Sequence, residues 1–168
     1  MQDNSSEMFP IVDEEGNITN AATRGECHGR SKLLHPVVHL HLFNTKGEIY
    51  LQKRPLWKDI QPGKWDTAVG GHVGLGESVG QALVRETKEE LGIILNESPS
   101  PFAHYIFESE RERELVFVHK IIYDGAICPT EELDSGRFWT KEEIKAYIGK
   151  QVFTPNFEDE YLRFEKEW

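Results

Sequence analysis

The sequence of 168 residues has little of three features that would each direct it to a particular class of protein. Its only two cysteines, Cys27 and Cys128, are too far apart for a disulfide framework or a CxxC metal site. No apolar run approaches the ~18 residues that a membrane helix needs. The polar, acidic start lacks the basic and apolar segments of a signal peptide. We therefore expect a cytoplasmic protein without a membrane association.

Positive charge is also scarce. The chain has 19 Lys+Arg against 29 Asp+Glu, which gives a formal net charge of -10. Proteins that coat nucleic acids derive their affinity from basic patches, so no nucleic-acid partner is expected. Small anionic ligands remain compatible with this charge where a metal ion or a few basic residues supply positive charge locally.

The order of the expected elements indicates an α+β fold with a mixed sheet between helices, because no regular βαβ rhythm is present. The length suits one domain over residues 1–168, with a loose tail at 1–8. Segments 9–12 and 18–23 predict an N-terminal hairpin, which could also pair with a second copy in a homodimer. Further extended segments are expected at 35–43, 48–54, 65–69, 102–107, 115–123 and 137–139.

Capping residues mark the expected helices. Ser78 with Gln81 forms a capping box, and Gly92 is a natural stop for the helix between them. Thr140 with Glu143 opens a second helix, which is expected to end near Gly149. At the C-terminus an aromatic stripe at helical spacing predicts a third helix docked on the core: Phe157, Tyr161, Phe164 and Trp168.

The first of these helices carries three carboxylates that point to a metal. Glu86, Glu89 and Glu90 lie at i, i+3 and i+4, so they share one helix face with Cβ atoms about 5–6 Å apart. Two carboxylates at ~5 Å repel by roughly 3 kcal/mol at an effective dielectric of 20. A hard cation such as Mg²⁺ would offset this repulsion and would also bridge carboxylates to phosphates. The preceding glycines, at 70, 71, 74 and 76, let the backbone approach a ligand closely.

An acidic helix face alone is usually solvated surface, but here the spacing matches a longer pattern, G-x5-E-x7-R-E-U-x-E-E-x-G-U. It falls on Gly71, Glu77, Arg85, Glu86, Glu89, Glu90, Gly92 and Ile93. This pattern is the Nudix box, and the chain resembles the Nudix hydrolase superfamily. The resemblance implies a mixed sheet sandwiched between helices. It also implies hydrolysis of a small-molecule diphosphate that depends on Mg²⁺ or Mn²⁺. One position departs from the box: Thr87 stands where a bulky aliphatic residue is usual.

The resemblance also implies a role for each box residue. Glu86, Glu89 and Glu90 would be metal ligands, together with the backbone carbonyl of Gly70. Arg85 would orient these glutamates, Glu77 would support the loop, and Gly71 and Gly92 would be structural. The general base would be a box glutamate or one of Glu112 and Glu114, in a stretch that otherwise reads as an exposed charged turn. Arg54 and Lys58 are candidates for binding phosphate oxygens, although surface charge explains them equally well.

A longer set of residues extends the resemblance beyond the box: His28, Leu34-His35, Leu42-Phe43-Asn44, Gly47, Arg54, Pro62-Gly63, Trp65, Gly71-His72, Leu75-Gly76-Glu77-Ser78 and Glu112-x-Glu114. Through these residues, nearly the whole span 24–139 resembles the branch that includes isopentenyl-diphosphate isomerase. In the isomerases, residues at the positions of His28, His35, His72, Glu112 and Glu114 hold a metal. The isomerases also need a cysteine directly before the glycine-histidine pair, where this chain has Gly70. The complete box and the missing cysteine imply an isomerase-like Nudix hydrolase.

Two other functions remain as alternatives. One is isopentenyl-diphosphate isomerase itself, and the other is a non-catalytic Nudix module that binds a nucleotide. The set of His28, His35 and His72 could equally be structural. His39 and His41, which alternate along one strand face, are expected to be packed or surface residues and not ligands.

Overall fold

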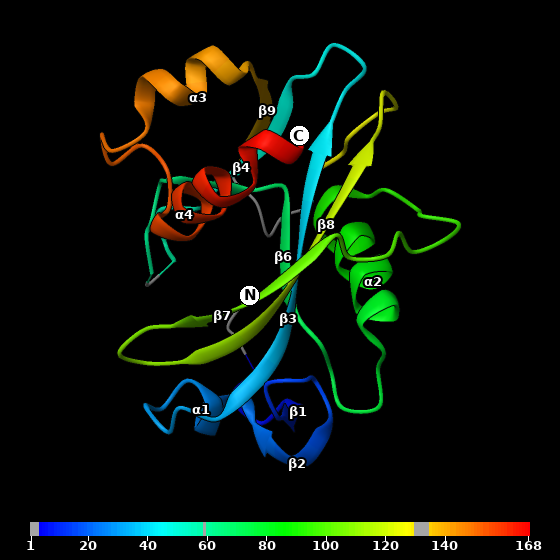
Figure 1. Ribbon diagram of the computed structural model, residues 1–168, viewed down its shortest axis with the longest axis vertical. Coiled ribbons are helices and arrows are strands. Elements are labelled where there is room, and N and C mark those ends of the chain that lie inside the picture. The colour runs from blue at the N-terminus through cyan, green and yellow to red at the C-terminus, as the bar shows by residue number, and fades with distance from the viewer. Residues whose placement is uncertain (1–3, 59, 130–134) are drawn as a thin grey trace.

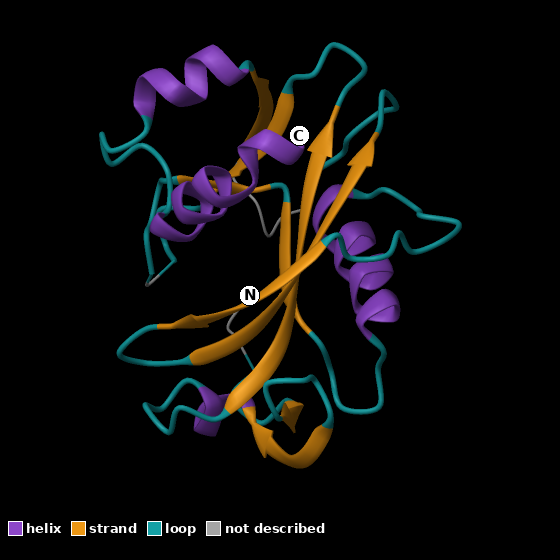
Figure 2. Ribbon diagram, viewed as in Figure 1, coloured by secondary structure: helices purple, strands orange, loops and turns teal. Residues whose placement is uncertain are grey.

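One mixed sheet forms the centre of the protein, with helices on both of its faces (Figures 1 and 2). A computed structural model describes residues 4–58, 60–129 and 135–168. Within these ranges seven strands form the sheet: β3 (Leu34–Phe43), β4 (Ile49–Lys53), β5 (Trp65–Thr67), β6 (Val69–His72), β7 (Ala103–Glu108), β8 (Arg113–Ile122) and β9 (Ser135–Trp139). The predicted α+β sandwich is confirmed.

Strand β3 is the central element. It pairs parallel with β8 along its whole length and antiparallel with β6, while its end pairs antiparallel with β4. Its side chains alternate between the two faces of the sheet. Val38, Leu40 and Leu42 are buried in the core that α2 (Val79–Leu91) covers. His39 and His41 lie on the other face, against α4 (Pro155–Phe164).

Helix α2 has the predicted ends. The Ser78 side chain accepts from the N–H of Gln81, the Gln81 side chain accepts in return, and Gly92 takes the left-handed conformation at φ 67°. The departure at Thr87 is accommodated inside the helix. This side chain is fully buried, and its hydroxyl donates to the carbonyl of Leu83 at 2.7 Å, so its polar atom is satisfied without a partner outside α2.

The helices on the opposite face also follow their capping signals. Helix α3 (Lys141–Tyr147) begins with the predicted box of Thr140 and Glu143. Helix α4 begins after Thr154 and buries two residues of the aromatic stripe, Phe157 and Tyr161. It ends at Phe164 and is followed by a 3₁₀ turn, η1 (Glu165–Glu167), so Trp168 lies beyond the helix that was expected to carry it. In the described part of the chain no helix is long and apolar enough to cross a membrane.

The N-terminal hairpin of β1 (Met8–Val12) and β2 (Ile18–Thr23) is confirmed. The predicted loose tail is wrong for residues 4–8, and its first part, 1–3, lies outside the described residues. Met8 begins β1, and the carbonyls of Ser5 and Glu7 accept from the N–H groups of Gly25 and Arg24. These bonds fix the segment to a short helix that was not predicted, α1 (Arg24–Cys27). Its signal was present in the sequence, because Thr23 and Glu26 form a capping box.

Two further local predictions were wrong in ways that matter for the site. Segment 65–69 is not one extended piece, because β5 pairs with β4 while β6 pairs with β3. Strand β8 begins at Arg113, so Glu114 lies within a strand and not in a charged turn. Both errors concern pairing with distant strands, and local sequence pattern does not specify such pairing.

Candidate functional site

The carboxylate face of α2, defined as Glu86, Glu89 and Glu90, lies against β6. Glu90 is largely buried, and its Oε2 accepts from the backbone N–H of Gly70 at 3.3 Å and from the Gln52 amide at 3.1 Å. Glu86 packs against Gly71, where a Cβ atom would overlap its carboxylate. Glu89 is the most open of the three, with 52% of its side chain exposed. The absence of a side chain at Gly71 is therefore what lets the Glu86 carboxylate come so close to the backbone of β6.

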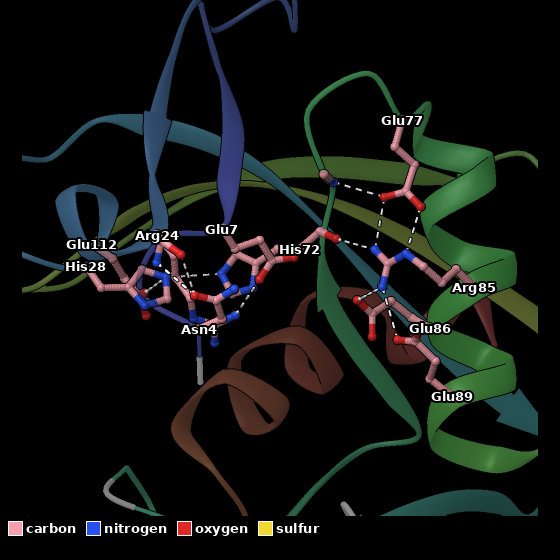
Figure 3. A network of polar contacts seen from close by, with 12 residues as sticks. Asn4, Glu7, Arg24, His28, His72, Glu77, Arg85, Glu86, Glu89 and Glu112 are labelled. Carbon is pink, nitrogen blue, oxygen red and sulfur yellow. Dashed lines mark hydrogen bonds and ion pairs between the residues drawn. The ribbon is translucent and has the colours of Figure 1, made fainter. Parts of the chain in front are cut away.

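Arg85 connects this face to the loop before the helix (Figure 3). Its guanidinium donates to both carboxylate oxygens of Glu77, at 2.7 and 2.9 Å, and to Glu86 at 2.6 Å and Glu89 at 3.1 Å. It also donates to the carbonyl of His72 at 3.0 Å. Burial alone would raise the pKa of Glu77, but the hydrogen bonds from Arg85 and from the Gly74 N–H lower it below its usual value. Arg85 thus joins the loop, the helix and β6.

The donor set of the carboxylate face suits a hard divalent cation. It presents three carboxylates within two turns of a helix, and oxygen is the ligand that Mg²⁺ and Mn²⁺ prefer. Glu90 accepts from two neutral donors, the Gln52 amide and the Gly70 N–H, which fix its orientation. The residues present therefore fit the metal that the sequence pattern implies.

A second group, the histidine–glutamate cluster, brings together residues from five segments of the chain. It consists of His28, His35, His72, Glu112 and Glu114. The Nε2 atoms of His28 and His72 are 3.1 Å apart, and His28 Nε2 is 3.3 Å from Glu112. The Oε1 atom of Glu114 lies 3.7 Å from Nε2 of His72 and 3.9 Å from Nε2 of His35. The ring of Phe9 stacks on His72 at 4.5 Å and closes one side of the cluster.

The cluster has two properties of a metal site. His35 Nε2 is buried and has no hydrogen-bond partner among the described residues, which is costly unless a ligand takes its lone pair. Burial, and next the charge of Glu112, raise the pKa of Glu114 to about 8. Burial likewise lowers the pKa of His72 well below its usual value and so favours the neutral imidazole that binds metals. A bound cation would accept the lone pair of His35 Nε2 and would stabilise the ionised form of Glu114, so these residues also fit a metal.

Comparison with known proteins identifies the family. The NUDIX domain model matches residues 33–157. The chain belongs to the Nudix family. An uncharacterised Nudix hydrolase of Listeria innocua is 33% identical over 90% of each chain. Isopentenyl-diphosphate delta-isomerase 1 of Photorhabdus laumondii is 28% identical over 92% of this chain and 93% of its own.

A solved structure has the same overall fold as this chain. DR0079 from Deinococcus radiodurans has a TM-score of 0.78 at 24% identity, covering 94% of this chain and 98% of its own. With the family match and the relatives named as hydrolases, the chain is a Nudix hydrolase, as predicted. The names of its relatives include both hydrolases and isomerases.

The two predicted phosphate-binding residues of this Nudix hydrolase lie in the loop between β4 and β5. Arg54 donates to the carbonyl of Ile60 at 3.0 Å and pairs with Asp66 at 3.4 Å. The Lys58 ammonium lies 4.9 Å from the centre of the Trp57 ring. Both residues therefore have contacts that stabilise their own loop, and binding of phosphate by them stays a prediction.

One polar group in the Nudix hydrolase was not found from the sequence. Glu160 of α4 is fully buried and accepts hydrogen bonds from His39 Nδ1 at 2.7 Å, from His41 Nε2 at 2.7 Å and from the Tyr105 hydroxyl at 2.6 Å. Burial would raise the pKa of Glu160, but His39 and His41 hold it below its usual range. Burial opposes the charging of His39, yet Glu160 raises its pKa to about 9. His39 and Glu160 are 121 positions apart, so no local pattern connects them.

Proposed function

We propose that this Nudix hydrolase cleaves the diphosphate bond of a small organic diphosphate, such as a nucleoside diphosphate linked to another moiety. The oxygen of a water molecule forms a bond to one phosphorus, and the bridging oxygen leaves with the other phosphorus. The water proton passes to a carboxylate, for which the box glutamates and Glu114 are the candidates. The observation that supports the proposal most is the complete carboxylate face, which Arg85 and the Gly70 N–H hold against β6 where Gly71 leaves room for Glu86.

Glu86, Glu89 and Glu90, with the carbonyl of Gly70, would hold the divalent cation. When bound, such a cation offsets phosphate charge and makes a water molecule more acidic. Arg85 and Glu77 act on this arrangement from outside it. Their bidentate pair fixes the guanidinium, and the guanidinium in turn orients Glu86 and Glu89. Glu89, the most exposed carboxylate, is the one most open to an incoming substrate.

We also propose that the histidine–glutamate cluster holds a second divalent cation. Its three imidazoles favour a divalent transition metal over Mg²⁺, and its two carboxylates are compatible with Mn²⁺. The Nε2 atom of buried His35, which has no hydrogen bond to the described residues, is the observation that supports this site over a purely structural one.

The same cluster favours isopentenyl-diphosphate isomerase as the second candidate function. Against it stands Gly70, which has no side chain to move a proton at carbon. A non-catalytic module is less favoured, because binding a nucleotide would not require three carboxylates in this arrangement.

The test is turnover of a panel of organic diphosphates with Mg²⁺ or Mn²⁺ in ¹⁸O-labelled water. We expect one ¹⁸O atom per cleavage, in a phosphate product. Glu89→Gln and Glu90→Gln should lower kcat by at least about 100-fold, because each removes charge from the carboxylate face. Glu97→Gln, on the exposed loop after α2, is the matched control and should retain full activity. Full activity in either α2 variant would contradict the proposal, and an allylic product without ¹⁸O would support the isomerase.

A further inference from the structure

His39 differs from the other residues that contact Glu160. Glu160 and His41 are completely buried, and His41 directs Nε2 at the carboxylate. His39 has 13% of its side chain exposed and uses Nδ1 for the same carboxylate. Among the described residues, Nε2 of His39 has no hydrogen-bond partner. A buried acceptor thus fixes one side of this imidazole and leaves the other side available.

The available side of His39 faces Gly70. The two residues are directly opposed in the β3–β6 pairing. A Cβ atom at Gly70 would lie 3.5 Å from His39 Cδ2 and 3.8 Å from Nε2, which is ordinary van der Waals contact. Because residue 70 has no side chain, the space beside the Nε2 edge of the imidazole is left open.

This space lies between the two groups described above. The N–H of Gly70 binds Glu90 of the carboxylate face. On the other side, His35 and His39 share a face of β3, and Glu114 is directly opposed to His35 in the β3–β8 pairing. His72 lies two residues after Gly70 on β6 and shares its face. A diphosphate that extends from one group toward the other therefore passes Gly70 and the Nε2 edge of His39.

We propose that His39 contacts the substrate, forming a hydrogen bond through Nε2 to a phosphate oxygen, and that Glu160 is the positioning residue that fixes its imidazole. The proposal rests on the hydrolysis of a diphosphate proposed above. A purely structural role would require only the Nδ1 bond to Glu160. His41 and Tyr105 already satisfy Glu160 from buried or partly buried positions, whereas His39 is the member that reaches the open space.

Two amides at position 39 separate the two roles. In His39→Asn the amide nitrogen falls near the position of Nδ1, so the bond to Glu160 can be kept while the reach toward Gly70 is lost. In His39→Gln the nitrogen falls near the position of Nε2, so the reach is kept while the bond to Glu160 is lost. We expect KM for the best substrate to rise about 10- to 100-fold in His39→Asn, with kcat changing less, and to rise less than about fivefold in His39→Gln.

A role confined to the Glu160 network gives the reverse order, with His39→Asn close to wild type and His39→Gln impaired. That result would overturn the proposal. Glu160→Gln tests positioning: KM should rise while the protein stays folded by circular dichroism, and Glu160→Asp should recover part of the loss. The matched control is His41→Gln, which replaces a buried histidine on the same carboxylate and should change KM less than about threefold. An equal rise in His41→Gln and His39→Asn would also overturn the proposal.

Binding of imidodiphosphate in the presence of Mg²⁺, measured by calorimetry, makes the test independent of turnover. The Kd should rise about 10- to 100-fold in His39→Asn and much less in His39→Gln. Equal Kd values for the wild type and both variants, or no binding by the wild type, would overturn the role of His39. Binding that depends on His39 without hydrolysis of any diphosphate would contradict only the proposed function.

Discussion

The carboxylate face and the histidine–glutamate cluster lie on either side of β6, but the chain builds them in opposite ways (Figure 3). The carboxylate face comes from two turns of one helix, and its geometry is set as soon as α2 forms. The cluster takes residues from the C-terminal cap of α1, from β3, from β6, from the β7–β8 connection and from β8. Its geometry exists only after the sheet has been assembled.

The difference extends to the chemistry. A single helix can readily place carboxylates near one another, and its acidic face remains partly hydrated, as the exposure of Glu89 shows. The cluster combines imidazoles with carboxylates around the buried side chains of His35 and Glu114, and this mixed ligand set selects more strongly among metal ions. We expect the first group to be a labile site for the catalytic cation and the second to be a tight, selective site.

The largest expected effect concerns metal binding at the cluster. His35→Asn keeps an amide near Nδ1, which contacts the Leu33 carbonyl at 2.9 Å, and removes the ligand at Nε2. The tighter of two Mn²⁺ sites should weaken by at least about 100-fold in a calorimetric titration. His104→Asn, an exposed histidine on β7, is the control. An unchanged two-site titration in His35→Asn would show that the cluster does not bind the ion.

An intermediate effect is expected at Arg85. Arg85→Lys keeps the charge but cannot make the bidentate contact to Glu77 while also reaching Glu86 and the His72 carbonyl. The value of kcat/KM should fall about 10- to 100-fold in steady-state assays. The control is Arg163→Lys, which alters an exposed pair with Asp159 on α4. If both variants retain wild-type kcat/KM, Arg85 does not orient the carboxylate face.

The smallest expected effect is the pH dependence that Glu114 gives to the stability of the fold, measured in the presence of a chelator. Its folded pKa of about 8 lies above the unfolded value, so its contribution to stability is complete below about pH 4.5 and is lost as the pH rises through 8. Glu114→Gln should therefore have a Tm a few °C above that of the wild type at pH 8, and the difference should shrink at pH 5. The same difference at both pH values would contradict the raised pKa. Adding Mn²⁺ should stabilise the wild type more than the variant.

The sequence predicted the features that depend on contacts between neighbouring residues, and it did not predict those that depend on contacts between distant segments. Ser78, Gln81 and Gly92 predicted where α2 begins and ends. The spacing of Glu86, Glu89 and Glu90 predicted that these carboxylates share one face of the helix. The cluster could be proposed only through resemblance to a family, because nothing local connects His28 with Glu114. The bond between His39 and Glu160 had no signal at all, since it depends on how α4 packs across β3.

The four residues of β6 constrain both groups at once. Gly71 leaves room for the Glu86 carboxylate, and the Gly70 N–H binds Glu90. The His72 carbonyl accepts from Arg85, and the His72 ring enters the cluster. Because successive side chains alternate between faces, deleting one residue here would turn the imidazole toward α2 and place a different neighbour beside Glu86. Point changes elsewhere can adjust one centre alone, but a register slip in this strand would disable both together.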